Sequence, residues 1–354
     1  MTFELEKLVR ENIKALKPYS SARSEFSGTA EIFLDANENS FGSPFPENFN
    51  RYPDPMQVKI KEKIGRRESV FSDGIFVGNG SDEAIDLLFR VFCRPKIDNV
   101  LICPPTYGMY EISAAINDTE VKKANLTEDF ELDPQVINSV ADPNTKLLFI
   151  CSPNNPTGNS LDREVILEII RKFNGIVVID EAYVHFSGKP GFISEIENFE
   201  NIVVLRTFSK AWGLAGLRVG LAFANPDIID LFNKVKPPYN VSEIAQRAIL
   251  EALENEESAA EMISAVIKQR AILAEKLSNL KFVKKIYPSD ANFILVKTDR
   301  ADAIYELLIA EKIVVRNRSR VEMCEGCLRI TVGTEEENNS LIRALKKYEE
   351  SIVY

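Results

Sequence analysis

Lys210 has the surroundings of a nucleophile in this 354-residue chain. It follows an apolar run and stands among small and hydroxyl residues, with Arg218 eight positions later. A lysine in partly apolar surroundings loses its proton more readily, and its neutral amine forms Schiff bases with carbonyl compounds. Taken alone, Lys210 is better explained as a surface lysine on a loop, so other motifs must decide between the two interpretations.

A carboxylate, Asp180, ends a nearly all-apolar run over residues 176–179. Such runs are typical of strands buried on both faces of a parallel sheet, and their carboxyl ends face the ligand-binding edge of open α/β folds. A desolvated carboxylate at that edge needs a cation, which a protonated pyridine nitrogen would supply. An aspartate that caps the following helix is about as good an interpretation.

A glycine turn at residues 78–80 leads from an expected strand into a helix that begins near Ser81. The free amides of a helix start bind phosphate. The turn is not a dinucleotide fingerprint, because Glu83 stands at the third glycine position. A phosphate here would need the amides and Ser81 with help from a cation. Arg218 is the candidate cation, and the hydroxyl of Ser209 is a candidate further donor. Alone, the motif is more often a plain turn.

Two further loops follow expected strands and carry amide or aromatic side chains. Residues 151–158 hold two prolines, which fix the backbone, and the amides of Asn154 and Asn155 can hydrogen-bond a phenolic oxygen. Residues 104–107 end in Tyr107, which offers a flat surface for stacking. Each loop is also explained as a strand-to-helix connection.

The elements that would position these residues alternate between strand and helix from about residue 75 to 225, which is typical of a mostly parallel α/β sheet. The expected strands are 75–77, 100–103, 146–151, 176–179, 202–205 and 217–223, with helices at 81–92 and 161–173. Later, we expect helices at 241–253 and 258–277, strands at 293–296, 313–315 and 328–332, and a closing helix. These patterns predict an arm over 1–30 that packs on the smaller domain, a large α/β domain over 31–240 and a smaller α+β domain over 241–354.

Charge and composition disfavour several classes of protein. The chain has 43 Lys and Arg against 53 Asp and Glu, and a net charge of -10 repels nucleic acid phosphates and anionic lipid. The single histidine, His185, excludes mechanisms that need two histidines in one chain, and we expect it to be structural. We therefore expect binding to neither nucleic acid nor membrane.

The cysteines and the start of the chain bear on the cellular compartment. Five cysteines, an odd number, favour free thiols in a reducing compartment over a disulfide framework. Cys324 and Cys327 have the spacing of zinc or redox sites, but no second pair accompanies them, so we expect no metal. A charged amphipathic start and the lack of an apolar run of about 18 residues predict a cytoplasmic protein.

Together, the motifs resemble the pyridoxal 5′-phosphate (PLP) site of class II, fold type I aminotransferases. The resemblance narrows to the histidinol-phosphate aminotransferases, because matching strings run along almost the whole chain. They are Lys17-Pro-Tyr-Ser-Ser-Ala-Arg23, Leu34-Asp-Ala-Asn-Glu-Asn39, Arg51-Tyr-Pro-Asp-Pro55, Gly78-Asn-Gly-Ser-Asp-Glu83, Ser209-Lys-Ala-Trp-Gly-Leu-Ala-Gly216, Lys234-Val-Lys-Pro-Pro-Tyr-Asn240 and Leu328-Arg-Ile-Thr-Val-Gly333. The resemblance implies a large domain with a mostly parallel sheet between helices, and a smaller α+β domain.

The resemblance also implies a role for each matching residue. Lys210 would hold PLP and move the substrate proton, Asp180 would keep the pyridine nitrogen protonated, and Tyr183 would complete the catalytic set. The resemblance also implies contacts with the cofactor ring, where Tyr107 would stack and Asn155 and Tyr183 would bind the 3′-oxygen. The implied phosphate-binding residues are Ser81, Asp82 through its amide, Thr207, Ser209, Arg218 and, from the neighbouring subunit, Tyr52. The implied substrate-binding residues are Tyr19, Asn155, Arg316 and Arg329, and no metal is implied.

The implied reaction is transamination between L-histidinol phosphate and 2-oxoglutarate in histidine biosynthesis, by a homodimer with shared active sites. The arm over 1–30 would then also contact the dimer partner. An aromatic amino acid aminotransferase or a phosphothreonine-type decarboxylase on the same scaffold is the nearest alternative. A non-catalytic effector-binding domain with this fold is more remote, because Lys210 and Asp180 are intact and neither end carries a basic DNA-binding extension.

Overall fold

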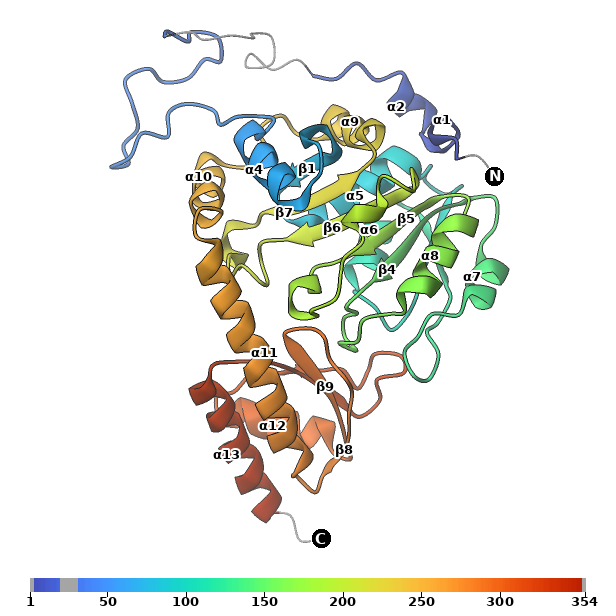
Figure 1. The fold of residues 1–354 in the computed structure, drawn as a ribbon, viewed down its shortest axis with the longest axis vertical. Helices are drawn as coiled ribbons and strands as arrows, with labels where there is room; N and C mark the ends of the chain where they lie inside the picture. Colours follow the sequence, from blue (N-terminus) through green and yellow to red (C-terminus); the bar gives the residue numbers. More distant parts are fainter. Residues whose placement is uncertain (1–2, 20–30, 352–354) are drawn as a thin grey trace.

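The computed structural model describes residues 3–19 and 31–351, which form a large and a smaller domain (Figure 1). The large domain is built on a seven-stranded sheet in the order β1-β7-β6-β5-β4-β2-β3. Neighbouring strands are parallel except at β7, which runs antiparallel to β1 and β6. The strands are β1 (Ile75–Gly78), β2 (Asn99–Ile102), β3 (Glu120–Lys123), β4 (Thr145–Cys151), β5 (Ile176–Asp180), β6 (Ile202–Thr207) and β7 (Gly220–Ala224). The expected mostly parallel α/β fold is confirmed.

Helices cover both faces of this sheet, and its strands other than the edge strand β3 are apolar on both sides. In β4, Leu148 and Ile150 join one core, which α4, α8 and α10 cover, and Leu147 and Phe149 join the other, which α5, α6 and α9 cover. The helices are α4 (Val58–Glu68), α5 (Ser81–Phe92), α6 (Met109–Ile116), α7 (Pro134–Val140), α8 (Arg163–Lys172), α9 (Pro226–Val235) and α10 (Glu243–Ala252), with short 3₁₀ turns η1 (Ser72–Gly74), η2 (Val184–Phe186), η3 (Ile193–Glu195) and η4 (Ala215–Leu217). Burial on both faces explains the unbroken apolar runs in the sequence.

The smaller domain packs helices on one antiparallel sheet, in the order β10-β11-β9-β8. Its elements are α11 (Glu256–Ser278), β8 (Val283–Ile286), β9 (Phe293–Thr298), α12 (Ala301–Ala310), β10 (Arg316–Asn317), β11 (Cys327–Thr331) and α13 (Glu335–Ser351). The long helix α11 extends from the large domain along the smaller one (Figure 1). No helix in the described ranges is long and apolar enough to cross a membrane.

Three strands depart from the sequence prediction. The strand expected at 313–315 is wrong, because the pairing with β11 begins at Arg316. The sequence does not predict β3 or β8, whose residues are Glu-Val-Lys-Lys and Val-Lys-Lys-Ile. Both strands lie at an edge of their sheet, where charged side chains are common and the apolar signal of a strand is weak.

The described helices of the N-terminal arm pack on the large domain. They are α1 (Leu5–Leu8) and α2 (Glu11–Lys14). Val9 and Ile13 share a core with Phe89 of α5, and the amide of Arg10 donates to the carbonyl of Val91 at 3.0 Å. The expected packing on the smaller domain is therefore wrong for these helices. Residues 20–30, which include the second half of the motif 17–23, lie outside the described residues.

The large domain also extends further along the chain than expected. Ala245 and Ile249 of α10 join the core that holds Ile60 of α4. The chain therefore passes to the smaller domain after α10 rather than at residue 240. Gln246 of α10 also donates to the carbonyl of Asp54 at 2.9 Å, which ties this helix to the segment before α4.

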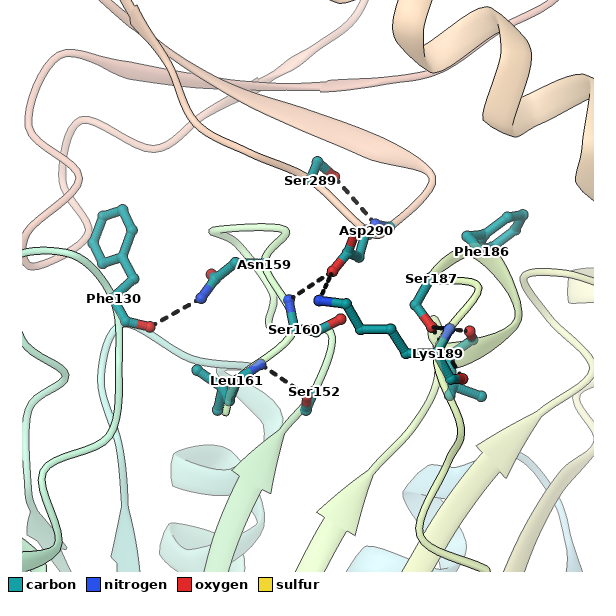
Figure 2. Close-up of polar contacts among 12 residues, drawn as sticks. Phe130, Ser152, Asn159, Ser160, Leu161, Phe186, Ser187, Lys189, Ser289 and Asp290 are labelled. Carbon is teal, nitrogen blue, oxygen red and sulfur yellow. Dashed lines mark hydrogen bonds and ion pairs between the residues drawn. The ribbon is translucent and has the colours of Figure 1, made fainter. Parts of the chain in front are cut away.

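A loop of the smaller domain is tied to loops at the edge of the large sheet (Figure 2). The carboxylate of Asp290 accepts from the ammonium of Lys189 at 2.8 Å and from the amide of Ser160 at 3.3 Å. The amide of Asp290 donates to the carbonyl of Gly158 at 2.7 Å. These contacts hold the smaller domain beside the loop that carries Asn155.

Candidate active site

A pocket lies where the carboxyl ends of β5 and β6 meet the first turn of α5. Its cavity volume is about 110 Å³. The residues that line it are Ser81, Asp82, Tyr107, Cys151, Asp180, Ala182, Tyr183, Thr207, Ser209, Lys210 and Arg218. Side chains from distant parts of the sequence meet here because parallel strands share a carboxyl edge.

Asp180 is the buried carboxylate of this pocket, with 3% of its surface exposed. Its oxygens accept from the hydroxyl of Tyr110 at 2.8 Å and from the amide of Ala182 at 3.0 Å. Burial raises the pKa of Asp180 to about 6, and these two donors oppose the shift. Because neither donor carries a positive charge, the site favours a cationic ligand beside Asp180.

Lys210 stands on a loop that two buried aromatic residues anchor. Phe208 and Trp212 are 2% and 7% exposed, and their ring centroids lie 5.4 Å apart. The ammonium of Lys210 lies 5.9 Å from the ring centroid of Tyr183. Desolvation lowers the pKa of Lys210, and the positive charges of Arg329 and Arg218 lower it further. The amine is therefore more readily available as a base or nucleophile than that of a free lysine.

The first turn of α5 and the guanidinium of Arg218 form one wall of the pocket. The guanidinium lies 3.2 Å from the carboxylate of Asp82 and donates to the hydroxyl of Ser209 at 3.4 Å. First-turn amides of a helix have no acceptor within the helix and remain available to a ligand. Gly220 allows β7 to approach this turn, since a Cβ there would lie 2.0 Å from the amide nitrogen of Ser81. The wall combines free amides, a hydroxyl and a cation, which is the chemistry of a phosphate site.

The two asparagines of the loop after β4 have different partners. Asn154 is buried and donates to the carbonyl of Pro105 and to the hydroxyl of Thr157, both at 2.8 Å, so it fixes the loop. Asn155 accepts through its side-chain oxygen from the guanidinium of Arg329. The contact between Asn155 and Arg329 brings the smaller domain to the edge of the pocket.

The other lining residues have local partners. The hydroxyl of Tyr107 donates to the carboxylate of Asp82 at 3.3 Å. Tyr183 is 7% exposed, with its ring edge-on to Phe293 at a centroid distance of 5.1 Å. The hydroxyl of Thr207 accepts from the amide of Ser209 at 3.1 Å. These contacts within the protein fix the orientation of the three side chains.

Three residues singled out from the sequence lie apart from this pocket. Tyr19 is 77% exposed on the N-terminal arm. Tyr52 is half-exposed and stacks on Tyr239 with a centroid distance of 4.3 Å, beside a different cavity. Arg316 is exposed on β10, directly opposite Arg329 in the sheet. A single chain therefore does not bring Tyr19 or Tyr52 into the pocket.

The sequence prediction omits Tyr110 and an ion pair behind the pocket. Tyr110 follows Tyr107 by one helical turn, and this spacing is its only sequence signal. Glu181 is buried beside Asp180 and accepts from the guanidinium of Arg206 at 2.9 Å, and Arg206 also contacts Glu68 at 2.7 Å. These partners are too far apart in sequence to be paired without the fold.

His185 and the cysteines lie outside the pocket chemistry. Burial lowers the pKa of His185 to about 4, so the imidazole is neutral near pH 7, in agreement with the expected structural role. Cys324 and Cys327 are buried, and burial raises the pKa of their thiols to about 12 and about 11. Thiols with such pKa values are poor nucleophiles and poor metal ligands near neutral pH.

Comparisons with known proteins point to one family. The family model described as "Aminotransferase class I and II" matches residues 46–345. The histidinol-phosphate aminotransferase of Cytophaga hutchinsonii is 50% identical over 348 residues, which are 98% of this chain and 100% of that protein. The solved histidinol-phosphate aminotransferase of Clostridium acetobutylicum is 26% identical, with a TM-score of 0.79 over 86% of this chain and 92% of that chain. The solved L-threonine-O-3-phosphate decarboxylase of Porphyromonas gingivalis is also 26% identical, with a TM-score of 0.73 over 85% and 91% of the two chains.

Proposed function

The chain belongs to the aminotransferase class I and II family and is a PLP-dependent aminotransferase of fold type I, and from this premise we propose its substrates. It transfers an amino group reversibly between L-histidinol phosphate and 2-oxoglutarate, giving 3-(imidazol-4-yl)-2-oxopropyl phosphate and L-glutamate. In histidine biosynthesis the reaction runs toward L-histidinol phosphate. The sequence identity of 50% to the histidinol-phosphate aminotransferase of Cytophaga hutchinsonii, over 98% of this chain, supports these substrates. The observation that carries the chemistry is that Lys210 and Asp180 line one pocket.

The residues of the pocket fit the cofactor of the family. Asp180 is a desolvated carboxylate without a cationic donor, which suits a protonated pyridine nitrogen. The turn at Ser81 and the guanidinium of Arg218 suit the cofactor phosphate. A Cβ at Gly80 would lie 2.8 Å from the guanidinium of Arg218 and would crowd this wall. When bound, PLP supplies a reactive carbonyl carbon and a ring that accepts electrons.

Lys210 then has two roles in this proposal. It holds the cofactor covalently between turnovers, and its amine takes the proton from the substrate Cα and returns it at the cofactor C4′. A lysine with a lowered pKa performs both roles better than a free lysine, because more of its amine is neutral near pH 7. Asn155 and Tyr183 would bind the ring 3′-oxygen of the cofactor, and Tyr107 would stack on its ring. Thr207 and Ser209 would support the phosphate together with the amide of Asp82.

The substrate ends meet arginines of the smaller domain. Arg329 binds the α-carboxylate of glutamate in one half-reaction and the phosphate of histidinol phosphate in the other, since a planar guanidinium pairs with both anions. The hydrogen bond with Asn155 orients Arg329. Arg316 and Tyr19 contribute to phosphate binding for the second substrate.

We also propose that the enzyme acts in the cytoplasm.

Half-reactions of the purified holoenzyme, followed by visible absorbance, test the proposed substrates. Histidinol phosphate, glutamate, phenylalanine and phosphothreonine are offered separately. We expect histidinol phosphate and glutamate to discharge the absorbance of the lysine-bound cofactor, and the other two to do so slowly or not at all. A preference for phenylalanine would indicate an aromatic amino acid aminotransferase. Release of CO₂ from phosphothreonine would indicate a decarboxylase. A protein that does not convert glutamate would be a binding domain.

A homodimer with shared active sites is also part of the proposal. Residues 31–57 cross the top of the large domain and extend outward (Figure 1), with Ile32, Leu34 and Phe41 77%, 84% and 103% exposed. Exposed apolar side chains in such number are typical of an interface. Tyr52 belongs to this segment. In a dimer that forms on this face, the Tyr52 hydroxyl of one subunit would contact the cofactor phosphate bound by the other subunit.

Subunit mixing tests this arrangement. The Lys210→Ala and Tyr52→Ala variants should each be weakly active, because each damages both sites of its own dimer. A mixed dimer carries both changes in one site and neither in the other, so mixing the two variants should restore up to about a quarter of wild-type activity. The measurement is transaminase activity after co-refolding, with dimer mass measured by light scattering. No recovery despite mixed dimers would contradict a shared site.

A further inference from the structure

One face of the smaller sheet carries three guanidinium groups. Arg316 of β10 lies directly opposite Arg329 of β11, and the amide of Arg318 extends the ladder by donating to the carbonyl of Cys327 at 2.8 Å. Side chains alternate along a strand, so Arg316 and Arg318 point to the same face as Arg329. Arg329 contacts Asn155, so this face is turned toward the large domain. Like charges on neighbouring strands destabilise a sheet unless something compensates them.

The described residues supply no acidic partner for this cluster. None of the ion pairs that they form involves Arg316, Arg318 or Arg329. The Nε atoms of Arg318 and Arg329 are buried without a hydrogen-bond partner. Burial and the charges of Arg329 and Arg316 lower the pKa of Arg318 to about 10. An arrangement that is unfavourable in the free protein is expected to bind an anion.

Arg318 lines a second cavity that adjoins the active-site pocket. Tyr107 lines both cavities, and Asn155 and Arg320 line the second one with Arg318. The volume of this second cavity is about 370 Å³, which is enough for a phosphate group.

Two carboxylates of this second cavity have partners of their own. Glu111 lies 2.6 Å from the ammonium of Lys123, and Glu322 accepts from the side-chain amide of Asn125 at 2.6 Å. They are therefore engaged away from Arg318. The guanidinium of Arg318 is the group in this cavity that has a buried, unpartnered donor.

We propose that Arg318 is a further substrate-binding residue, which binds the phosphate of the phosphorylated amine in the cavity beside Tyr107. The proposal rests on the proposed function, because it requires a phosphorylated substrate. No carboxylate of the described residues pairs with Arg318, and the planar guanidinium can offer two parallel donors to two phosphate oxygens, a geometry that lysine lacks. Arg318 thereby selects substrates that carry a phosphate.

Comparison of L-histidinol phosphate with unphosphorylated L-histidinol tests the role of Arg318. In Arg318→Gln, kcat/KM for the phosphorylated amine should fall about 10- to 100-fold, the effect of losing a charged hydrogen bond, while kcat/KM for histidinol changes less than about twofold. Arg318→Lys should recover only part of the loss. Arg343→Gln, the same change on the exposed face of α13, is the matched control and should leave both substrates unaffected.

Calorimetry with inorganic phosphate separates this proposal from the proposed function. In the PLP-loaded holoenzyme the cofactor occupies its own phosphate site, so added phosphate reports on other anion sites. We expect its Kd to rise at least fivefold in Arg318→Gln and to stay unchanged in Arg343→Gln. A wild-type enzyme that ignores histidinol phosphate would overturn the proposed function, but this titration would still decide on Arg318. Equal losses for both amines, or unchanged phosphate binding, would overturn the role of Arg318.

Discussion

Replacing Lys210 with Ala is expected to lower kcat for transamination by at least about a thousandfold, because the group that moves the Cα proton is removed. The pocket walls at Ser81, Arg218 and Asp180 do not depend on the lysine side chain, so the variant should still bind PLP. The measurement is turnover with histidinol phosphate and 2-oxoglutarate, together with the visible spectrum of the variant. The spectrum should lose the band of the lysine-bound cofactor.

Two controls separate this loss from a folding defect. Lys172→Ala changes an exposed lysine on α8 and should leave turnover within about twofold of wild type, as expected for a surface change. A small primary amine added to Lys210→Ala should restore part of the activity, since it can supply the missing base. Retention of more than a tenth of the wild-type rate in Lys210→Ala would show that another group carries the proton.

Replacing Asp180 with Asn is expected to lower kcat by about a hundred- to a thousandfold, the range seen when a preorganised electrostatic contact is lost. The amide has nearly the same shape. Its oxygen can keep the bond from the amide of Ala182, and its NH2 group can donate to the hydroxyl oxygen of Tyr110, so packing should survive. A neutral amide cannot hold a positive charge on the pyridine nitrogen, however, and the ring then accepts electrons poorly. The measurement is kcat for the wild-type and Asp180→Asn holoenzymes. Their thermal unfolding midpoints show whether the variant is folded.

The pH dependence of cofactor binding gives a second readout for Asp180. In the cofactor-free protein the carboxyl titrates at about 6, because burial disfavours its charged form. A cationic ring nitrogen beside it lowers that pKa, so binding releases a proton below about pH 6. Cofactor affinity should therefore rise with pH up to about 6 and then level off, and Asp180→Asn should remove this rise.

Tyr110→Phe keeps the charge of Asp180 and loses one hydrogen-bond donor to it, so it should reduce kcat much less than Asp180→Asn. An Asp180→Asn enzyme with wild-type turnover would exclude the charge of Asp180 from the mechanism.

Local patterns in the sequence determined much of the fold. The helix predicted at 81–92 matches α5 (Ser81–Phe92), and every strand of the large sheet except β3 is predicted to within a few residues. This is possible because a strand buried on both faces is a continuous apolar run and an amphipathic helix repeats at its own period. The sequence also predicts the positions of Asp180, Lys210 and the turn before Ser81, since each lies at or shortly after the carboxyl end of a strand and parallel strands share one carboxyl edge.

The features that depend on pairing between distant segments required the tertiary structure. The edge strands β3 and β8 owe their existence to a neighbour, because their own residues are too charged to signal a strand. The packing of α2 on α5 rests on a match between two apolar surfaces that no local pattern reveals. The same holds for the hydrogen bond from Tyr110 to Asp180, which joins residues 70 positions apart.

The arginines of the smaller domain show the division most clearly. The sequence alone determined that guanidinium groups crowd the segment 316–320 and that Arg329 stands on a strand. Only the register of β10 against β11 decided that Arg316, Arg318 and Arg329 share a face, and only the docking of the two domains turned that face toward Asn155. A shift of one residue in that register would send Arg316 and Arg318 to the opposite face, because side chains alternate along a strand. Composition and spacing thus determine which chemical groups are available, whereas register and domain packing decide which of them meet.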